Sequence, residues 1–139
     1  MTNAESLYGD EHVKVYRETG GETGHIWKEG STILLLTTTG RKSGEPRTTP
    51  LIYENAGDDY VIIASKGGAP EDPGWYRNLR KSPDVELQVL DDVFPAHARV
   101  AEGDERERLW KLAAQQWPGY DDYQKKTDRE IPVVVLERT

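Results

Sequence analysis

The order of the β-strand signals constrains the fold of this chain more than any other feature. Six short runs are rich in β-branched and other apolar residues: 32–38, 47–53, 60–64, 85–90, 96–101 and 131–136. Successive parallel strands need long crossover connections, usually helices, and these runs follow no such βαβ rhythm. The order therefore predicts an α+β fold, a mostly antiparallel β-barrel of about six strands with helices packed at its edges.

Three or four helices are expected around this sheet. The first covers residues 5–18 and ends at a glycine-rich stretch. A short helix over 73–81 is bounded by prolines. Apolar residues at helical spacing predict a longer helix over 104–116. The sequence YDDYQKK, at 120–126, is expected to add a further turn before the last strand.

Length and composition narrow the class of protein. The 139 residues suit one compact unit, which we divide into an N-terminal arm or helix (1–30) and a barrel domain (31–139). No apolar run reaches the roughly 18 residues of a membrane helix, and the polar start is unlike a secretory signal, so a cytoplasmic protein is expected. With no cysteine and three isolated histidines, no disulfide and no metal site are expected.

The distribution of charge favours a small anionic ligand over a nucleic acid. The net charge is −7, whereas proteins that bind nucleic acids usually carry a basic excess. Residues 41–81 nevertheless hold seven Lys and Arg against six Asp and Glu. A cationic region on an acidic body would attract a small anion without attracting nucleic acid.

The turn between the first two predicted strands, GRKSGEPR at 40–47, is the strongest candidate for such a site, and we call it the basic turn. Exposed backbone N–H groups beside cations are a combination that binds phosphate. A solvated hairpin tip is the alternative for a basic turn taken alone. The hydroxyls and the proline that follow favour a strand start that faces a ligand. The candidate binding residues are Arg41, Lys42, Ser43, Gly44, Arg47, Thr49 and Pro50.

Two more clusters follow the third predicted strand. The first is a donor cluster that we call the cofactor turn, in which glycine permits close backbone approach: Ser65, Lys66, Gly67 and Gly68. The second lies on the short helix, where Trp75 and Asn78 share a face beside Tyr76. An ordinary turn and ordinary core packing would explain each cluster alone. Their convergence would instead place Trp75 as the wall of a planar-ligand pocket and Asn78 as a hydrogen-bonding anchor for backbone or ligand.

An aromatic stripe near the C-terminus is the candidate substrate-binding site. Trp117, Tyr120 and Tyr123 recur every three residues. Core packing explains many such stripes, but the polar, loop-like neighbours also allow a mobile lid. A tyrosine hydroxyl can orient a carbonyl or nitro oxygen and deliver a proton. Tyr120 and Tyr123, together with Ser65, are therefore the candidate catalytic residues.

Three segments taken together closely resemble the deazaflavin (F420)-dependent nitroreductase family of actinobacteria. They are TTTGRKSGEPRTTPLIY at 37–53, ASKGGAPEDPGWYRNL at 64–79 and WPGYDDYQKKTDREIPVVVLE at 117–137. The resemblance runs in unbroken order from about residue 32 to the end. It implies a split β-barrel like that of the flavin reductases. It also implies a reductase that transfers a hydride from reduced F420 to a quinone, a nitroaromatic compound or another conjugated electrophile.

The same resemblance assigns roles to the candidate residues. The basic turn would hold the phosphate and the start of the acidic tail of F420. The cofactor turn would contact the deazaflavin ring, and Trp75, Tyr76 and Asn78 would complete the cleft. The family lid has three tyrosines, and Trp117 stands in the first of these positions, which removes one hydroxyl. A quinone acceptor would also allow peripheral contact with a membrane.

Two alternatives concern the cofactor and the activity. The same barrel could use FMN in place of F420, or the protein could be a non-catalytic carrier that binds F420. Preferential binding of FMN would support the first, and stoichiometric F420 binding without reduction of any acceptor would support the second. The expected partner is a small-molecule electron acceptor and not a nucleic acid; the oligomeric state is left open.

Overall fold

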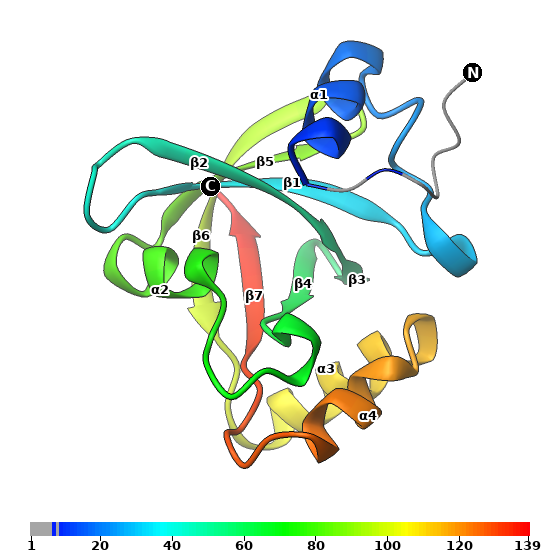
Figure 1. Cartoon of the computed structure of the whole chain (residues 1–139), viewed down its shortest axis with the longest axis vertical. Helices are drawn as coiled ribbons and strands as arrows, with labels where there is room; N and C mark the ends of the chain where they lie inside the picture. The colour runs from blue at the N-terminus through cyan, green and yellow to red at the C-terminus, as the bar shows by residue number, and fades with distance from the viewer. Residues whose placement is uncertain (1–6, 8) are drawn as a thin grey trace.

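The computed structural model describes residue 7 and residues 9–139, and its strands form one curled antiparallel sheet (Figure 1). The strand order is β2-β1-β5-β6-β7-β4-β3, and every pair between the described strands is antiparallel. The strands are β1 (Ile33–Thr39), β2 (Pro46–Ile52), β3 (Glu54–Ala56), β4 (Asp59–Ile63), β5 (Asp84–Val89), β6 (Asp92–Val100) and β7 (Val133–Arg138). The predicted α+β class is confirmed.

The helices lie around the edges and ends of this sheet, as expected (Figure 1). They are α1 (Gly9–Thr19), α2 (Gly74–Lys81), α3 (Gly103–Gln116) and α4 (Gly119–Lys125), with two 3-10 turns, η2 (Lys28–Gly30) and η3 (Lys66–Gly68). The first helix begins at Gly9 and not at residue 5; residues 1–6 and 8 lie outside the described part of the chain. The other helices match their predicted positions closely.

The largest differences from the predicted strands are one additional strand and one earlier start, and β7 lies two residues later than expected. A seventh strand, β3, pairs with β4, and its three residues are too few to give a periodic signal. Strand β6 begins at Asp92, four residues earlier than expected, and contains Pro95. A proline is tolerated there because β7 pairs with β6 only from Ala96 onward, so the first part of β6 has a strand partner on one side only.

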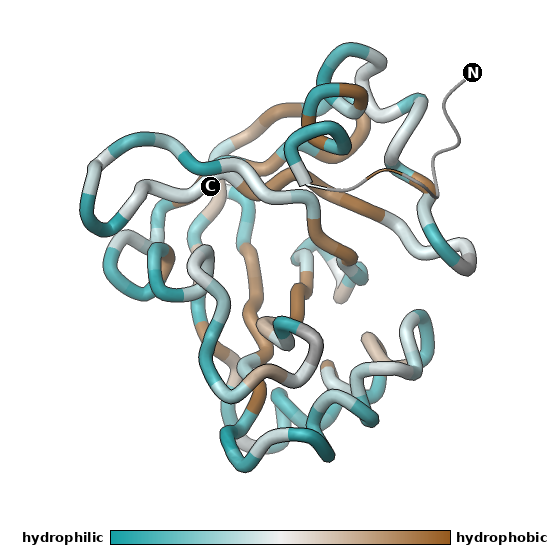
Figure 2. The backbone as a smooth tube through the Cα atoms, in the orientation of Figure 1, coloured by the Kyte–Doolittle hydropathy of each residue, from teal (hydrophilic) through white to brown (hydrophobic). Residues whose placement is uncertain are grey.

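Burial on both faces of the sheet explains the two continuous apolar runs, ILLL in β1 and VVVL in β7. Leu34 and Leu36 point into the main core, whereas Ile33 and Leu35 pack against α1. Along β7, Val134 and Leu136 belong to the main core, and the alternate valines pack against α3 and α4. Figure 2 shows these strands as the most hydrophobic part of the backbone, with hydrophilic turns around them.

Candidate functional site

A cleft of about 430 Å³ lies where β2, the cofactor turn and the aromatic stripe meet. Its size suits a small-molecule ligand. Short elements bring its walls together: the end of β4 leads into η3, α2 follows, and α4 packs against η3. The cleft brings together eight of the predicted site residues, which are Thr49, Pro50, Ser65, Lys66, Trp75, Trp117, Tyr120 and Tyr123.

A second, smaller hollow of about 200 Å³ lies beside the basic turn, and we call it the basic hollow. Helix α2 contributes a residue to each hollow, because Trp75 lines the cleft and Asn78 lines the basic hollow. Gly44 forms the turn itself, with a φ of 74°. The predicted residues around the hollow are Arg41, Lys42, Ser43, Arg47 and Asn78. The cations of the basic turn thus line the basic hollow, whereas the lysines that line the cleft are Lys28 and Lys66.

Asn78 fixes the basic turn to α2. Its buried side-chain amide accepts hydrogen bonds from the backbone N–H of Arg41 at 3.2 Å and from the Arg41 guanidinium at 3.0 Å, and it donates to the Thr38 hydroxyl at 3.1 Å. Lys81 also donates to the Arg41 carbonyl at 2.8 Å. The Asn78 amide is therefore occupied by the protein, and Lys42 and Arg47, both exposed, are the cations best placed to meet a ligand.

Tyr76 differs from its neighbours on α2. It is buried in the main core, and its hydroxyl accepts a hydrogen bond from Arg80 at 2.8 Å. It is not among the residues that line the cleft or the basic hollow. Its contribution is to anchor α2 against the sheet, which holds Trp75 at the cleft.

The cofactor turn has a backbone conformation that places constraints on its residues. Lys66 has a φ of 47°, which is unfavourable for a residue with a side chain. Gly68 has a φ of 83°, and a Cβ atom there would lie 2.6 Å from the carbonyl oxygen of Tyr123. The turn therefore touches the backbone of α4 directly. Lys66 also lies 3.4 Å from Glu71, an exposed ion pair that contributes little to stability.

The aromatic stripe forms one wall of the cleft. Trp117 donates its indole N–H to the Tyr123 hydroxyl at 3.4 Å, so that hydroxyl keeps its own proton for another acceptor. The Tyr120 and Tyr123 rings meet edge to face, with centroids 6.1 Å apart. Burial raises the pKa of Tyr120 above its ordinary value, and a phenol in that state stays protonated at neutral pH.

Sequence reasoning missed the N-terminal wall of the cleft, which includes Trp27 and His12. The Trp27 ring stacks on Trp117, with centroids 6.1 Å apart and an angle of 15° between the planes. The Nε2 atom of the buried His12 ring lies 2.9 Å from the carbonyl oxygen of Gly24. A tryptophan in an otherwise polar, glycine-rich stretch was the only available signal, because the contact spans 90 positions of the chain.

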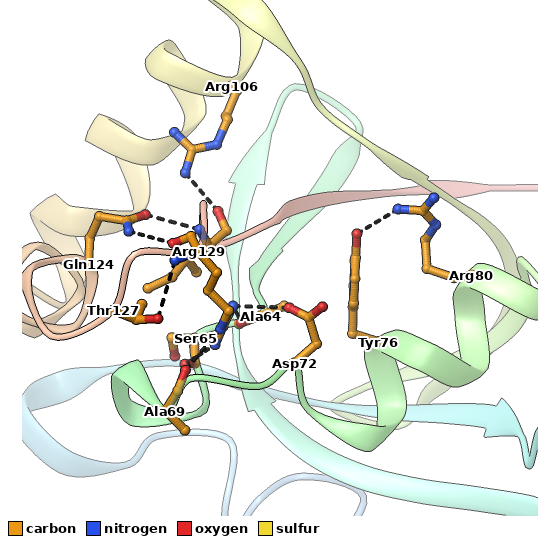
Figure 3. A network of polar contacts seen from close by, with 11 residues as sticks. Ala64, Ser65, Ala69, Asp72, Tyr76, Arg80, Arg106, Gln124, Thr127 and Arg129 are labelled. Atoms are coloured by element: carbon orange, nitrogen blue, oxygen red, sulfur yellow. Dashed lines mark hydrogen bonds and ion pairs between the residues drawn. The ribbon is translucent and has the colours of Figure 1, made fainter.

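A third missed residue is Arg129, which precedes β7. Its guanidinium hydrogen-bonds to backbone carbonyls in and beside the cofactor turn and pairs with Asp72 (Figure 3). In the sequence TDRE the arginine stands among acidic neighbours, and nothing there indicates contacts with residues 57 to 65 positions earlier.

The comparisons with known proteins point to reductases that use F420. The family model of the F420H(2)-dependent quinone reductases matches residues 9–138. An F420H(2)-dependent quinone reductase of Mycobacterium tuberculosis is 45% identical over 130 residues, which cover 91% of this chain and 87% of the relative. The solved structure of an F420-H2 dependent reductase, FDR-A, has a TM-score of 0.71 and 49% identity over 76% of this chain and 93% of that one.

A more distant structure supports the fold alone. The haem storage protein HutZ from Vibrio cholerae has a TM-score of 0.56 and 16% identity, over 96% of this chain and 92% of that one. Together the comparisons confirm the predicted split barrel, the predicted enzyme class and the dependence on F420. The chain belongs to the F420H(2)-dependent quinone reductase family.

Proposed function

We propose that this protein binds reduced F420 with its ring in the cleft and its phosphate at the basic turn, and reduces a quinone that stacks beside the ring. The observation that carries the proposal is that one short helix, α2, contributes to both hollows, with Trp75 lining the cleft and Asn78 lining the basic hollow. Aromatic and apolar walls suit a planar ring, and the cations of the basic turn suit an anionic tail. The residues present thus fit both parts of F420.

The chemistry is divided between cofactor and protein. Bound F420 supplies the hydride, and the residues of the cleft hold, orient and protonate. Tyr123 is the residue that we assign to proton delivery, because its hydroxyl accepts a hydrogen bond from Trp117 and can donate its own proton. Tyr120 and Ser65 line the same cleft, and we assign them to orienting the quinone and the ring.

Access to a lipid-soluble quinone is part of the proposal. No helix among the described residues is long and apolar enough to cross a bilayer. Ile26 is 55% exposed and adjoins Trp27, a residue of the cleft wall. We therefore propose a cytoplasmic protein that touches the membrane surface at this side of the cleft. Sedimentation with phospholipid vesicles tests the contact, and Ile26→Asn should weaken it.

One experiment separates the proposed function from its alternatives. The purified protein is titrated with F420 and with FMN, and reduced F420 is then mixed with a naphthoquinone and with a nitroaromatic compound. The proposal expects F420 to bind more tightly than FMN and the quinone to be reduced with multiple turnovers. Tighter binding of FMN would contradict the cofactor assignment. Stoichiometric F420 binding without reduction of either acceptor would identify a carrier.

A further inference from the structure

Arg129 satisfies a group of backbone carbonyls around the cofactor turn (Figure 3). Its guanidinium donates to the carbonyl oxygens of Ala64 at 3.2 Å, Ser65 at 2.8 Å and Ala69 at 2.9 Å. It also pairs with the carboxylate of Asp72 at 3.0 Å. The Arg129 side chain is only 15% exposed. One side chain thus ties both ends of the turn together.

The backbone on either side of Arg129 is fixed to the end of α4. The Gln124 side chain donates to the carbonyl of Arg129 at 2.8 Å and accepts from the N–H of Ile131 at 3.0 Å. The N–H of Arg129 donates to the Thr127 hydroxyl at 3.3 Å. Because Gln124 follows Tyr123 directly, the guanidinium of Arg129 connects the cofactor turn to the helix that carries the aromatic stripe.

The cofactor turn needs such support. Lys66 holds a positive φ that a residue with a side chain rarely adopts, and conformations of this kind persist only where the surroundings enforce them. The planar guanidinium offers five donors in a fixed arrangement, and here it meets four acceptors. A lysine ammonium cannot reproduce this geometry, because it is a point charge with three donors.

We propose that Arg129 is a positioning residue for the reaction, which sets the cofactor turn against the deazaflavin ring and fixes its distance from the hydroxyls of the aromatic stripe. The inference rests on the proposed function, because it assumes that the ring binds in the cleft. It makes F420 affinity and the rate of hydride transfer depend on a residue that contacts neither the ring nor the quinone. The affinity for the quinone should depend on Arg129 much less.

The test compares Arg129→Lys with Arg99→Lys. Arg99, on β6, is the control. Its guanidinium forms a bidentate pair with Glu105 at 2.6 and 3.0 Å, and Arg99 does not line the cleft. Fluorescence titration gives the Kd for F420, steady-state kinetics give kcat and the KM for a naphthoquinone, and thermal unfolding gives Tm. The visible circular dichroism of bound F420 reports the setting of the ring.

The expected result is specific to the cleft. Arg129→Lys should raise the F420 Kd and lower kcat by about tenfold or more each, change the quinone KM by less than about threefold and alter the dichroism of bound F420. Arg99→Lys should lower Tm and leave the F420 Kd and kcat within about twofold. If Arg129→Lys lowers Tm but leaves the F420 Kd and kcat within that twofold range, Arg129 has a structural role only and the inference is wrong.

A second variant keeps the inference testable if Arg129→Lys does not fold. Asp72→Asn removes the charge that faces Arg129 but leaves the backbone carbonyl contacts, and it should raise the F420 Kd by about threefold or more. An unchanged Kd and kcat in Asp72→Asn would overturn the inference. Failure of the proposed function looks different: wild-type protein would bind F420 and reduce no quinone, while the Kd comparison would still test Arg129.

Discussion

Trp117 brings an indole N–H to the aromatic stripe as a hydrogen-bond donor. It donates to the Tyr123 hydroxyl and stacks on Trp27. Because an indole can only donate, this direction of the hydrogen bond leaves the Tyr123 proton for a quinone oxygen. Hydride transfer to a quinone creates negative charge on that oxygen, so a positioned phenol stabilises the product as it forms.

Replacing Tyr123 with phenylalanine tests this role. Tyr123→Phe should lower kcat for quinone reduction by about tenfold to a hundredfold, because general acid catalysis typically contributes rate factors of this order or larger. The F420 Kd should change by less than about twofold, since the ring contact is kept. Tyr76→Phe is a suitable control, because it removes a hydroxyl that bonds to Arg80 in the core. Equal kcat values for Tyr123→Phe and wild type would remove Tyr123 from the mechanism.

A second tyrosine, Tyr16, stabilises the folded chain at the N-terminal side of the cleft. The fully buried Tyr16 hydroxyl donates to the Ile33 carbonyl at 3.0 Å and accepts from the Leu90 N–H at 2.7 Å. Burial raises the pKa of Tyr16 from 10.0 to about 12. A folded-state pKa above the unfolded value means that this stability is complete below pH 10 and is lost as the pH rises toward 12.

Tyr16→Phe should therefore lower the free energy of unfolding at pH 8 by about 1–3 kcal/mol, because it leaves buried backbone groups without partners. Above pH 10 the gap between wild type and variant should narrow, since the wild type loses the same contribution there. Denaturant unfolding at pH 8 and at pH 11 measures both effects. A gap that stays constant or widens with pH would show that Tyr16 does not titrate as its burial requires.

At the scale of elements, the cleft depends on the contact between η3 and α4. Gly68 lies against the backbone of Tyr123, and Arg129 hydrogen-bonds to the Ser65 carbonyl of the same turn. Neither contact could be predicted, because both depend on how the chain between α4 and β7 folds back onto the end of β4. The donors of the turn, its glycines and the helical stripe were visible in the sequence because they are local patterns.

Gly68→Ala tests the contact between η3 and α4. The new Cβ would lie 2.6 Å from a backbone oxygen, so the two elements must separate. We expect a loss of about 1–3 kcal/mol in the free energy of unfolding, together with weaker F420 binding. Gly57→Ala is the control: its φ is 64°, but its Cβ would meet nothing within 4 Å, so it carries the cost of the backbone conformation alone. Equal losses in stability and unchanged F420 binding in both variants would show that the close contact is unimportant.

At the scale of the whole molecule, the order of the sequence signals was enough to predict the architecture. It was not enough to predict how the walls of the cleft come together. Antiparallel pairing, the hairpin with the basic turn, and the four helices were predictable from apolar periodicity, prolines and glycines. The stacking of Trp27 on Trp117 was not, because residues 90 positions apart meet only after the sheet has curled. The sequence also showed that the chain is acidic overall and that cations gather on the basic turn. These cations line the basic hollow in the structure.

The most direct test of the account is the F420 affinity of the double variant Lys42→Ala/Arg47→Ala, which removes the two exposed cations of the basic turn. Its control is Arg108→Ala/Lys111→Ala, which removes the same charge from α3, away from the basic turn (Figure 1). Fluorescence titration gives Kd, and thermal unfolding confirms that each variant is folded. The account predicts that the first variant weakens F420 binding by more than about threefold, or roughly 0.7 kcal/mol, and that the control stays below that limit. An affinity within about threefold of wild type for the first variant would contradict the assignment of the basic turn to the anionic part of F420.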